Sequence, residues 1–434
     1  METAKKNYAL PIAMMFALFF MIAFVTGLQN PMGVIIKSQF TLSNLQSQFG
    51  NFANFIAYAF MGIPAGLLLQ KMGYKKTALS AIAVGFIGVA VTFLSSRIGG
   101  GAESKNLIFS IYLVGAFISG FSMCMLNTVV NPMLNTLGGG GNKGNQLIQF
   151  GGACNSIGAT IVPVLVGYLM GDISKASLGS AAPALYIAMG IFALAFIVLF
   201  TMNIPEPYVA KKETTIKEDL AGPLSYRHFI FGAIAIFIYV GVEVGIPNIA
   251  NLFMTNAVEL GGLGIDTTIA GTVVGTYWFL MLIGRLVGGA LGSKFSSRSM
   301  LTFVASIAII FILLGIFSPL DTKVQMPVFK SDISFGFAEV PISIMFFVLC
   351  GLCTSVMWGG IFNLAVEGLG KYTAAASGIF MTMVCGGGIL PAIQGLVADK
   401  TSYLTSYWVI FAGILYMLFF ALIGSRITKK EKAQ

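Results

Sequence analysis

Two stretches of this sequence repeat each other, and they decide the fold. The first is Gly62-Ile-Pro-Ala-Gly66 followed by Lys71 and Lys76, and the second is Gly284-Arg-Leu-Val-Gly288 followed by Lys294 and Arg298. One constant offset takes Gly62 to Gly284, Gly66 to Gly288 and Lys76 to Arg298. Small residues spaced by four let membrane helices approach closely, and a basic turn lies at a membrane surface. The repeat therefore predicts two halves of the same topology.

The composition places both halves in a membrane. Of the 434 residues, 57% are hydrophobic and only 9% are charged, against about 25% charged in soluble proteins. Mean hydropathy is +0.88. The apolar runs are about 20 residues long, the length of a spanning helix and not of a barrel strand. These values exclude a cytosolic enzyme, a secreted domain, a disordered chain and a nucleic-acid-binding module.

Twelve apolar runs are long enough to cross the bilayer. They fall near residues 9–33, 46–69, 77–95, 106–137, 146–170, 182–203, 229–254, 268–291, 300–319, 341–363, 374–398 and 405–425. An even number places both termini on one side, and that side carries more than twice as many Lys and Arg residues as the other. The positive-inside rule therefore predicts a multi-pass inner-membrane protein with both termini in the cytoplasm.

The polar stretch 204–228 is predicted to be a cytoplasmic linker between two six-helix bundles. The N-terminal bundle is expected over 1–203, and the C-terminal bundle, with its short cytoplasmic tail, over 229–434. Two six-helix halves with repeated connections are typical of secondary transporters. Twelve helices of unrelated origin are the alternative, and the constant offset argues against it.

Motifs for a cofactor or an ATP-driven engine are not expected to act here. Gly139-Gly-Gly141-Asn-Lys-Gly144 fits a dinucleotide fingerprint by letter, but it follows a membrane helix and not a strand. Ser or Thr does not follow Lys143, so there is no Walker A motif. The five cysteines lie inside apolar runs, which favours packing over a metal site. We expect no cofactor, no metal and no enzyme activity, and concentrating work would come from an ion gradient.

Polar side chains within the apolar spans form the candidate binding site. Such groups are costly against lipid and usually face a cavity or a partner helix. Amides both donate and accept, which suits sugar hydroxyls, and tryptophan offers a flat apolar face to a sugar ring. The candidate substrate-binding residues are Gln29, Asn30, Asn51, Asn127, Asn131, Gln149, Asn155, Asn248, Trp278, Trp358, Asn363 and Gln394. The set predicts a neutral polyhydroxylated substrate; the alternative is that the amides only join helices.

The repeated stretches also carry the candidate conformational clamp on the cytoplasmic side. Its predicted gating residues are Gly66, Lys71, Gly73, Lys76, Arg285 and Gly288. Their basic side chains are expected to pair with acidic helix ends.

Several short motifs occur in an order that resembles a known family. They include Phe40-Thr-Leu-Ser-Asn-Leu-Gln46, Asn131-Pro132, Asn155-Ser-Ile-Gly158, Tyr239-Val-Gly-Val-Glu243, Gly284-Arg285 and Gly386-Gly-Gly-Ile389. From Phe16 to about Arg426, the chain resembles the fucose–galactose–glucose:proton symporter family of the major facilitator superfamily. The resemblance implies an all-α protein of twelve transmembrane helices that imports a monosaccharide with protons through the bacterial inner membrane. We expect a monomer.

The chain departs from this family where protons are handled. The resemblance implies carboxylates at the positions of Asn30 and Asn127, and an amide cannot titrate. Glu243 is the sole carboxylate deep in a predicted span. It could be a proton site, a sodium ligand, or a protonated group that hydrogen-bonds sugar or a neighbouring helix. Coupling to H⁺, coupling to Na⁺ and sugar uniport therefore stay open at this point.

The sequence predicts a transporter that imports a neutral hexose or deoxyhexose, such as fucose, glucose or galactose, by alternating access. A major facilitator exporter of another small metabolite is the first alternative. A sugar sensor that binds without transport is the second, and the short tail after Arg426 argues against it.

Overall fold

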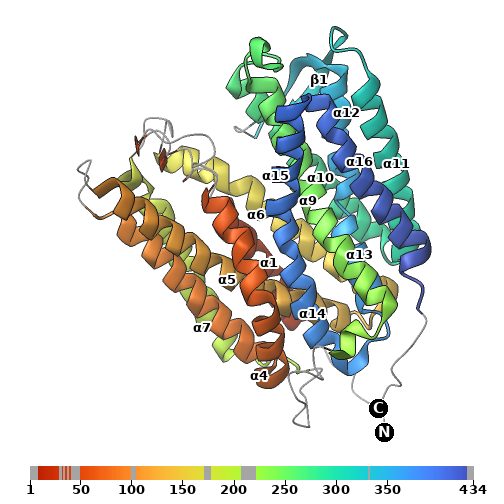
Figure 1. Ribbon diagram of the computed structural model, residues 1–434. Coiled ribbons are helices and arrows are strands. Elements are labelled where there is room, and N and C mark those ends of the chain that lie inside the picture. The colour runs from red at the N-terminus through yellow and green to blue at the C-terminus, as the bar shows by residue number, and fades with distance from the viewer. Residues whose placement is uncertain are drawn as a thin grey trace. The chain divides into compact units, whose positions relative to one another are not determined.

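The computed structural model describes residues 8–28, 32, 35–36, 39–40, 49–98, 104–170, 177–206, 221–330 and 333–427. The chain divides into two compact units, shown in Figure 1, and each is described by itself. Unit 1 comprises Met1–Gly222 and Lys371–Thr382, and unit 2 comprises Pro223–Gly370 and Met383–Gln434. The candidate residues Gln29 and Asn30 lie outside the described residues, and so does 207–220 of the predicted linker.

The regular elements in the described part of unit 1 are helices. Its helices are α1 (Ala9–Gly27), α4 (Phe49–Ser95), α5 (Lys105–Leu137), α6 (Gly141–Met170), η2 (Leu178–Ala181), α7 (Ala182–Thr201) and α14 (Thr373–Thr382). The last of these comes from the second half of the sequence, yet it packs against α4 and α5 of unit 1.

Helix α4 contains two of the expected spans, because its backbone leaves the helical region at Gly73, where φ is 82°. The two arms return to the same level of α5. A Cβ at Gly120 would lie 2.8 Å from the Asn54 carbonyl oxygen, and a Cβ at Gly88 would lie 2.5 Å from Ser119 Oγ. Glycine is required at position 73 for the turn, and at positions 88 and 120 for the close approach of the helices.

Unit 2 contains the remaining helices and one β-hairpin. Its elements are α9 (Arg227–Thr255), η3 (Val258–Leu260), α10 (Thr267–Leu291), α11 (Ser297–Phe317), β1 (Lys323–Phe329), β2 (Phe335–Pro341), α12 (Ile342–Thr354), α13 (Met357–Val366), η5 (Met383–Cys385), α15 (Gly386–Lys400), α16 (Tyr403–Phe419) and the π-turn η6 (Phe420–Gly424). The short turn η4 (Gly370–Tyr372) lies where the two units join along the chain.

These elements confirm the predicted all-α membrane fold. Ten helices in the described part of the chain are long and apolar enough to cross a membrane, and α4 holds two spans. Helix α6 adds one more at the predicted place. Spans ten and eleven are each broken in two, as α12 with α13 and as α14 with α15.

The hairpin is the element that the sequence analysis did not predict. It occupies 323–341, which the apolar pattern leaves as a loop between two spans. Its strands pair antiparallel, from Lys323 with Pro341 at the open end to Phe329 with Phe335 at the turn.

Candidate functional site

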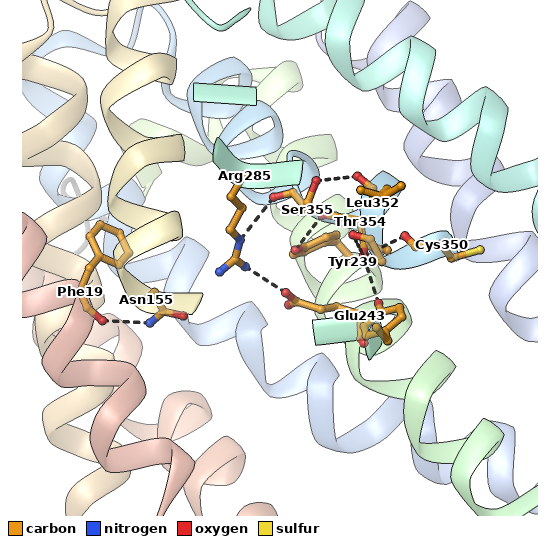
Figure 2. Close-up of polar contacts among 11 residues, drawn as sticks. Phe19, Asn155, Tyr239, Glu243, Arg285, Cys350, Leu352, Thr354 and Ser355 are labelled. Atoms are coloured by element: carbon orange, nitrogen blue, oxygen red, sulfur yellow. Dashed lines mark hydrogen bonds and ion pairs between the residues drawn. The ribbon is translucent and has the colours of Figure 1, made fainter. Parts of the chain in front are cut away.

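A buried ion pair joins two helices of unit 2, and Figure 2 shows its surroundings. Arg285 Nη2 on α10 lies 3.1 Å from Glu243 Oε1 on α9, and the side chains are 11% and 13% exposed. A charge at this depth is costly unless it is paired, and a charge-assisted hydrogen bond of this length is strong. From the sequence, Glu243 is the candidate ion-coupling residue and Arg285 a candidate gating residue; the structure brings them together.

Hydroxyl groups hold the helix that carries Glu243 in place. Pro247 has no N–H, so the Glu243 carbonyl one turn earlier loses its helical partner. The Tyr277 hydroxyl donates to that carbonyl at 3.1 Å and also contacts Thr354 Oγ1 at 3.0 Å. The Tyr239 hydroxyl donates to the Thr354 carbonyl at 3.1 Å. These bonds fix the part of α9 that carries the carboxylate.

Two candidate tryptophans lie beside this network. The Trp358 ring meets Tyr239 edge-on, with ring centroids 6.3 Å apart, and the Trp278 ring stands at 90° to Tyr277. Both indoles are half-buried. Unit 2 therefore brings an ion pair, two indole rings and several hydroxyls into one region.

The other three candidates of unit 2 are placed differently. Asn248 is exposed on α9, one turn after the ion pair. Asn363 is buried and donates to Ser297 Oγ at 2.8 Å, so it joins α13 to the start of α11. Gln394 is fully buried against Gly245, and its amide atoms have no hydrogen-bond partner among the described residues. Asn363 and Gln394 contact neighbouring helices in this structure.

Two amides of α5 in unit 1 form a hydrogen-bonded chain that reaches α4. Asn127 Nδ2 donates to the Tyr58 hydroxyl at 3.0 Å, and Asn131 Nδ2 donates to the Asn127 carbonyl at 2.9 Å. Asn155 on α6 donates to the Phe19 carbonyl of α1 at 3.1 Å (Figure 2). Tyr58 was not among the predicted site residues. Its position inside a predicted span was the signal that could have identified it, since a hydroxyl there needs a partner.

The remaining two candidates of unit 1 lie on different helices. Gln149 is buried on α6 and bonds to Asn145, and Asn51 is half-buried on α4.

The predicted clamp region of unit 1 is held by a carboxylate. Glu206 accepts the backbone N–H groups of Tyr74 at 2.6 Å and Lys75 at 3.0 Å, directly after the bend at Gly73. Lys75 Nζ in turn donates to the carbonyls of Phe200 at 2.8 Å and Met202 at 2.6 Å. The candidates Lys71 and Lys76 are exposed. The sequence analysis missed Glu206 because it lies far away along the chain.

The glycines of the repeat lie at close helix crossings. A Cβ at Gly66 would lie 2.8 Å from the Gly378 Cα, and one at Gly378 would lie 2.6 Å from the Gly62 carbonyl oxygen, so α14 crosses α4 at backbone contact. In unit 2, Gly284 and Gly288 lie instead against the junction of α12 and α13, at Ser355 and Val356.

A hydroxyl adds a polar contact to the α14 crossing. Pro132 frees the Thr128 carbonyl of α5, and Ser377 Oγ donates to it at 3.1 Å. Proline-freed carbonyls are thus satisfied by a hydroxyl in both units, at Thr128 and at Glu243. A proline inside a span signals a free carbonyl, but the sequence does not say which residue will satisfy it.

Comparison with known proteins supplies the family. The sequence matches the Major Facilitator Superfamily profile over residues 15–392. The chain belongs to the major facilitator superfamily. It is 29% identical to a glucose/galactose transporter of Brucella abortus over 98% of this chain and 96% of that protein. It is 23% identical to the L-fucose-proton symporter of Escherichia coli K12, over 91% and 88% of the two chains.

Solved structures agree with this major facilitator fold. FucP in the outward conformation superposes with a TM-score of 0.77 at 22% identity, covering 96% of this chain and 99% of FucP. The proton:xylose symporter XylE gives 0.70 at 16% identity, covering 96% and 95%. The family resemblance and the twelve-helix fold predicted from the sequence are confirmed, and the named relatives are transporters and not enzymes.

Proposed function

We propose that this major facilitator protein imports a neutral monosaccharide by alternating access, with Glu243 as its ion-coupling group. The observation that carries the proposal is the buried Glu243–Arg285 pair beside Trp278 and Trp358. Its support from relatives is an alignment over nearly the full length with proteins named as glucose/galactose transporters. Hexoses or deoxyhexoses are therefore the substrate class.

The ion pair supplies a way to couple a cation to sugar. While Glu243 is ionised, it holds the Arg285 guanidinium, whose Nε also donates to the Ser355 carbonyl at 3.4 Å. A proton on Glu243 removes the negative charge and frees the guanidinium to donate to a sugar hydroxyl. Sodium on the carboxylate would compete with Arg285 in the same way. In a uniporter, the pair would stay closed throughout the cycle.

We assign sugar contacts within each unit separately. In unit 2 the indoles of Trp278 and Trp358 offer apolar faces, and Arg285 offers donors. In unit 1 the Asn127 amide offers donors and acceptors beside the Tyr58 hydroxyl, and the Asn155 amide offers them beside α1. Asn363 and Gln394 bond or pack within unit 2, so we rank them below the others as sugar contacts.

The gate of the proposed cycle is the crossing of α14 over α4. The crossing combines backbone contact at Gly66 and Gly378 with the Ser377–Thr128 hydrogen bond, and none of these four residues is charged. Contacts of this kind can open and re-form without a large desolvation cost. The Glu206 contacts keep the neighbouring bend at Gly73 rigid while the crossing opens.

We also propose that the protein lies in the inner membrane. Both termini would lie in the cytoplasm of a bacterium, because the loops on their side carry most of the Lys and Arg residues. The functional unit would be the monomer.

Uptake of labelled sugars into proteoliposomes tests the proposed substrate class. Glucose, galactose and fucose are expected to enter faster than into protein-free liposomes and to compete with one another. A neutral sugar alcohol and a lipophilic cation serve as controls. Uptake of the cation without uptake of any sugar would replace the proposal with an exporter of apolar compounds.

A further inference from the structure

The β-hairpin of unit 2 has one polar end and one apolar end. At its open end, Lys323 Nζ lies 3.2 Å from Glu339 Oε1, and Gln325 donates to the same carboxylate at 3.3 Å. Toward the turn, the same face of the hairpin carries Phe335 and Phe337, whose side chains are 70% and 71% exposed. Neighbouring aromatic side chains exposed to this extent form a patch of the kind that marks contact with a membrane or a partner.

The apolar end packs against the side of α10 that faces away from the core of unit 2. The Phe329 N–H donates to Thr276 Oγ1 at 2.9 Å, and the Phe329 ring stacks on Phe279 with centroids 4.3 Å apart. Phe335 meets Phe279 edge-on at 5.6 Å. At helical spacing below Phe279, the exposed Ile283 continues the same face.

That face of α10 is turned away from the core of unit 2. Tyr277 and Met281 occupy the opposite side of the helix and are buried. Ile283 and Val287 are exposed and apolar, as the lipid-facing side of a membrane helix should be. The hairpin therefore rests on a surface that lipid covers further along the same helix.

The helix that leads into the hairpin shows the same continuity. Ile310, Leu314 and Phe317 form an exposed apolar row at the end of α11, and the chain then enters β1. Phe317 contacts Trp408 near the start of α16, so the hairpin lies at the end of unit 2 where α16 begins. Figure 1 shows β1 at this end.

The position along α10 gives the depth of the apolar end. Thr276 follows the first residue of α10, Thr267, by roughly 14 Å of helix at 1.5 Å per residue. The contact at Phe279 is one turn deeper. Phe335 is thus level with the membrane-spanning part of α10, while the Lys323–Glu339 pair lies nearer the helix ends.

We infer that the hairpin is a membrane anchor. Phe335 and Phe337 enter the lipid leaflet on the side opposite the termini, and Lys323, Gln325 and Glu339 stay at its headgroups. The anchor fastens the lipid boundary to α10, the helix that carries Arg285. The inference uses the membrane-spanning fold but does not depend on which substrate is transported.

Site-directed spin labelling measures directly whether the tip of the hairpin lies in lipid or in water. Nitroxides are attached at Phe337→Cys and, as the matched control on the same face, at Gln325→Cys. The background has the five native cysteines replaced by alanine and is checked by gel filtration and circular dichroism. The protein is reconstituted into vesicles of phosphatidylethanolamine and phosphatidylglycerol. A third label at Phe303→Cys, exposed on α11 within a span, gives the lipid reference.

Power saturation with oxygen and with a water-soluble nickel chelate then decides the outcome. The label at position 337 should be several-fold more accessible to oxygen than to the nickel chelate, and so should the lipid reference at position 303. The label at position 325 should be more accessible to the nickel chelate than to oxygen. Greater nickel accessibility at 337 would place the tip in water and overturn the inference. If neither agent reaches the label at position 337, protein covers that position, and the inference is also overturned.

A tryptophan probe gives a readout that needs no cysteine replacement. Phe337→Trp should gain fluorescence that lipids brominated on the acyl chain quench, measured as the difference from the parent. Equal quenching of the variant and the parent would contradict lipid contact.

Discussion

Replacing Arg285 in the buried Glu243–Arg285 pair should lower the free energy of unfolding far more than replacing Lys323 in the exposed Lys323–Glu339 pair of the hairpin. Arg285→Met keeps the length and apolar stem of the side chain but leaves the Glu243 carboxylate without its partner. The carboxylate is 13% exposed, and breaking a buried pair costs about 3–5 kcal/mol. The matched control is Lys323→Met, whose pair with Glu339 is 61% and 54% exposed. An exposed pair contributes about 0–1 kcal/mol.

The second half of this test is a double-mutant cycle. Glu243→Gln removes the negative charge and keeps the shape, so Glu243→Gln with Arg285→Met should be more stable than Arg285→Met alone. The free energy of unfolding is measured by SDS titration in mixed micelles for all four proteins. Lowering the pH should shrink the loss in Arg285→Met, because a protonated Glu243 carries no charge that needs a partner.

Additive losses would refute the reasoning. If the two single changes sum to the double change within about 0.5 kcal/mol, the residues are not coupled. A loss in Arg285→Met no larger than that in Lys323→Met would show that the pair is solvated.

Three further changes test other contacts. Asn127→Ala should weaken sugar binding by about 5- to 150-fold, the equivalent of about 1–3 kcal/mol for a lost amide partner, by equilibrium binding of labelled sugar; unchanged affinity would show that Asn127 only joins α4 to α5. Ser377→Ala should slow transport and leave sugar affinity within about tenfold, roughly 1.4 kcal/mol. Gly378→Ala should slow transport more, because its Cβ would lie 2.6 Å from the Gly62 carbonyl oxygen. Wild-type transport rates in both variants would exclude this crossing as the gate. Glu206→Gln should slow transport more than Lys71→Ala, because Glu206 holds two backbone N–H groups and Lys71 is exposed; the reverse order would return the clamp to the lysines.

Periodic features were predictable from the sequence, and pairings between distant residues were not. The apolar runs and the repeated glycines predicted the spans, because helix length and close packing depend on local composition. The bend at Gly73 follows from the same local signals. The partners of Gly284 and Gly288, which are Ser355 and Val356 in the structure, could not be predicted in this way, and their part in a clamp stays a prediction.

The partners within the site depend on how the helices face one another. Glu243 was predicted as a functional group because a lone carboxylate in a span is costly, but its partner depends on how α10 faces α9. Sequence spacing does not give that orientation. The hairpin was missed for a different reason: a short strand pair with Pro327 and Gly336 among its residues reads as a loop, because Pro and Gly are rare inside strands.

The contacts of Glu206 and Ser377 were also beyond the sequence. Each bonds to backbone atoms of a segment far away along the chain, and backbone acceptors and donors leave no residue pattern to detect. Prolines such as Pro132 mark where such a partner is needed.

Gradient-driven sugar accumulation in proteoliposomes tests the central claim most directly. Wild type should concentrate sugar when an inward proton or sodium gradient is imposed, and the gradient that works identifies the coupling ion. Glu243→Gln should lose that accumulation and keep sugar-for-sugar exchange, because it cannot bind and release the cation. Accumulation by Glu243→Gln at the wild-type level would contradict the assignment of coupling to Glu243, and a wild type indifferent to both gradients would make the protein a uniporter.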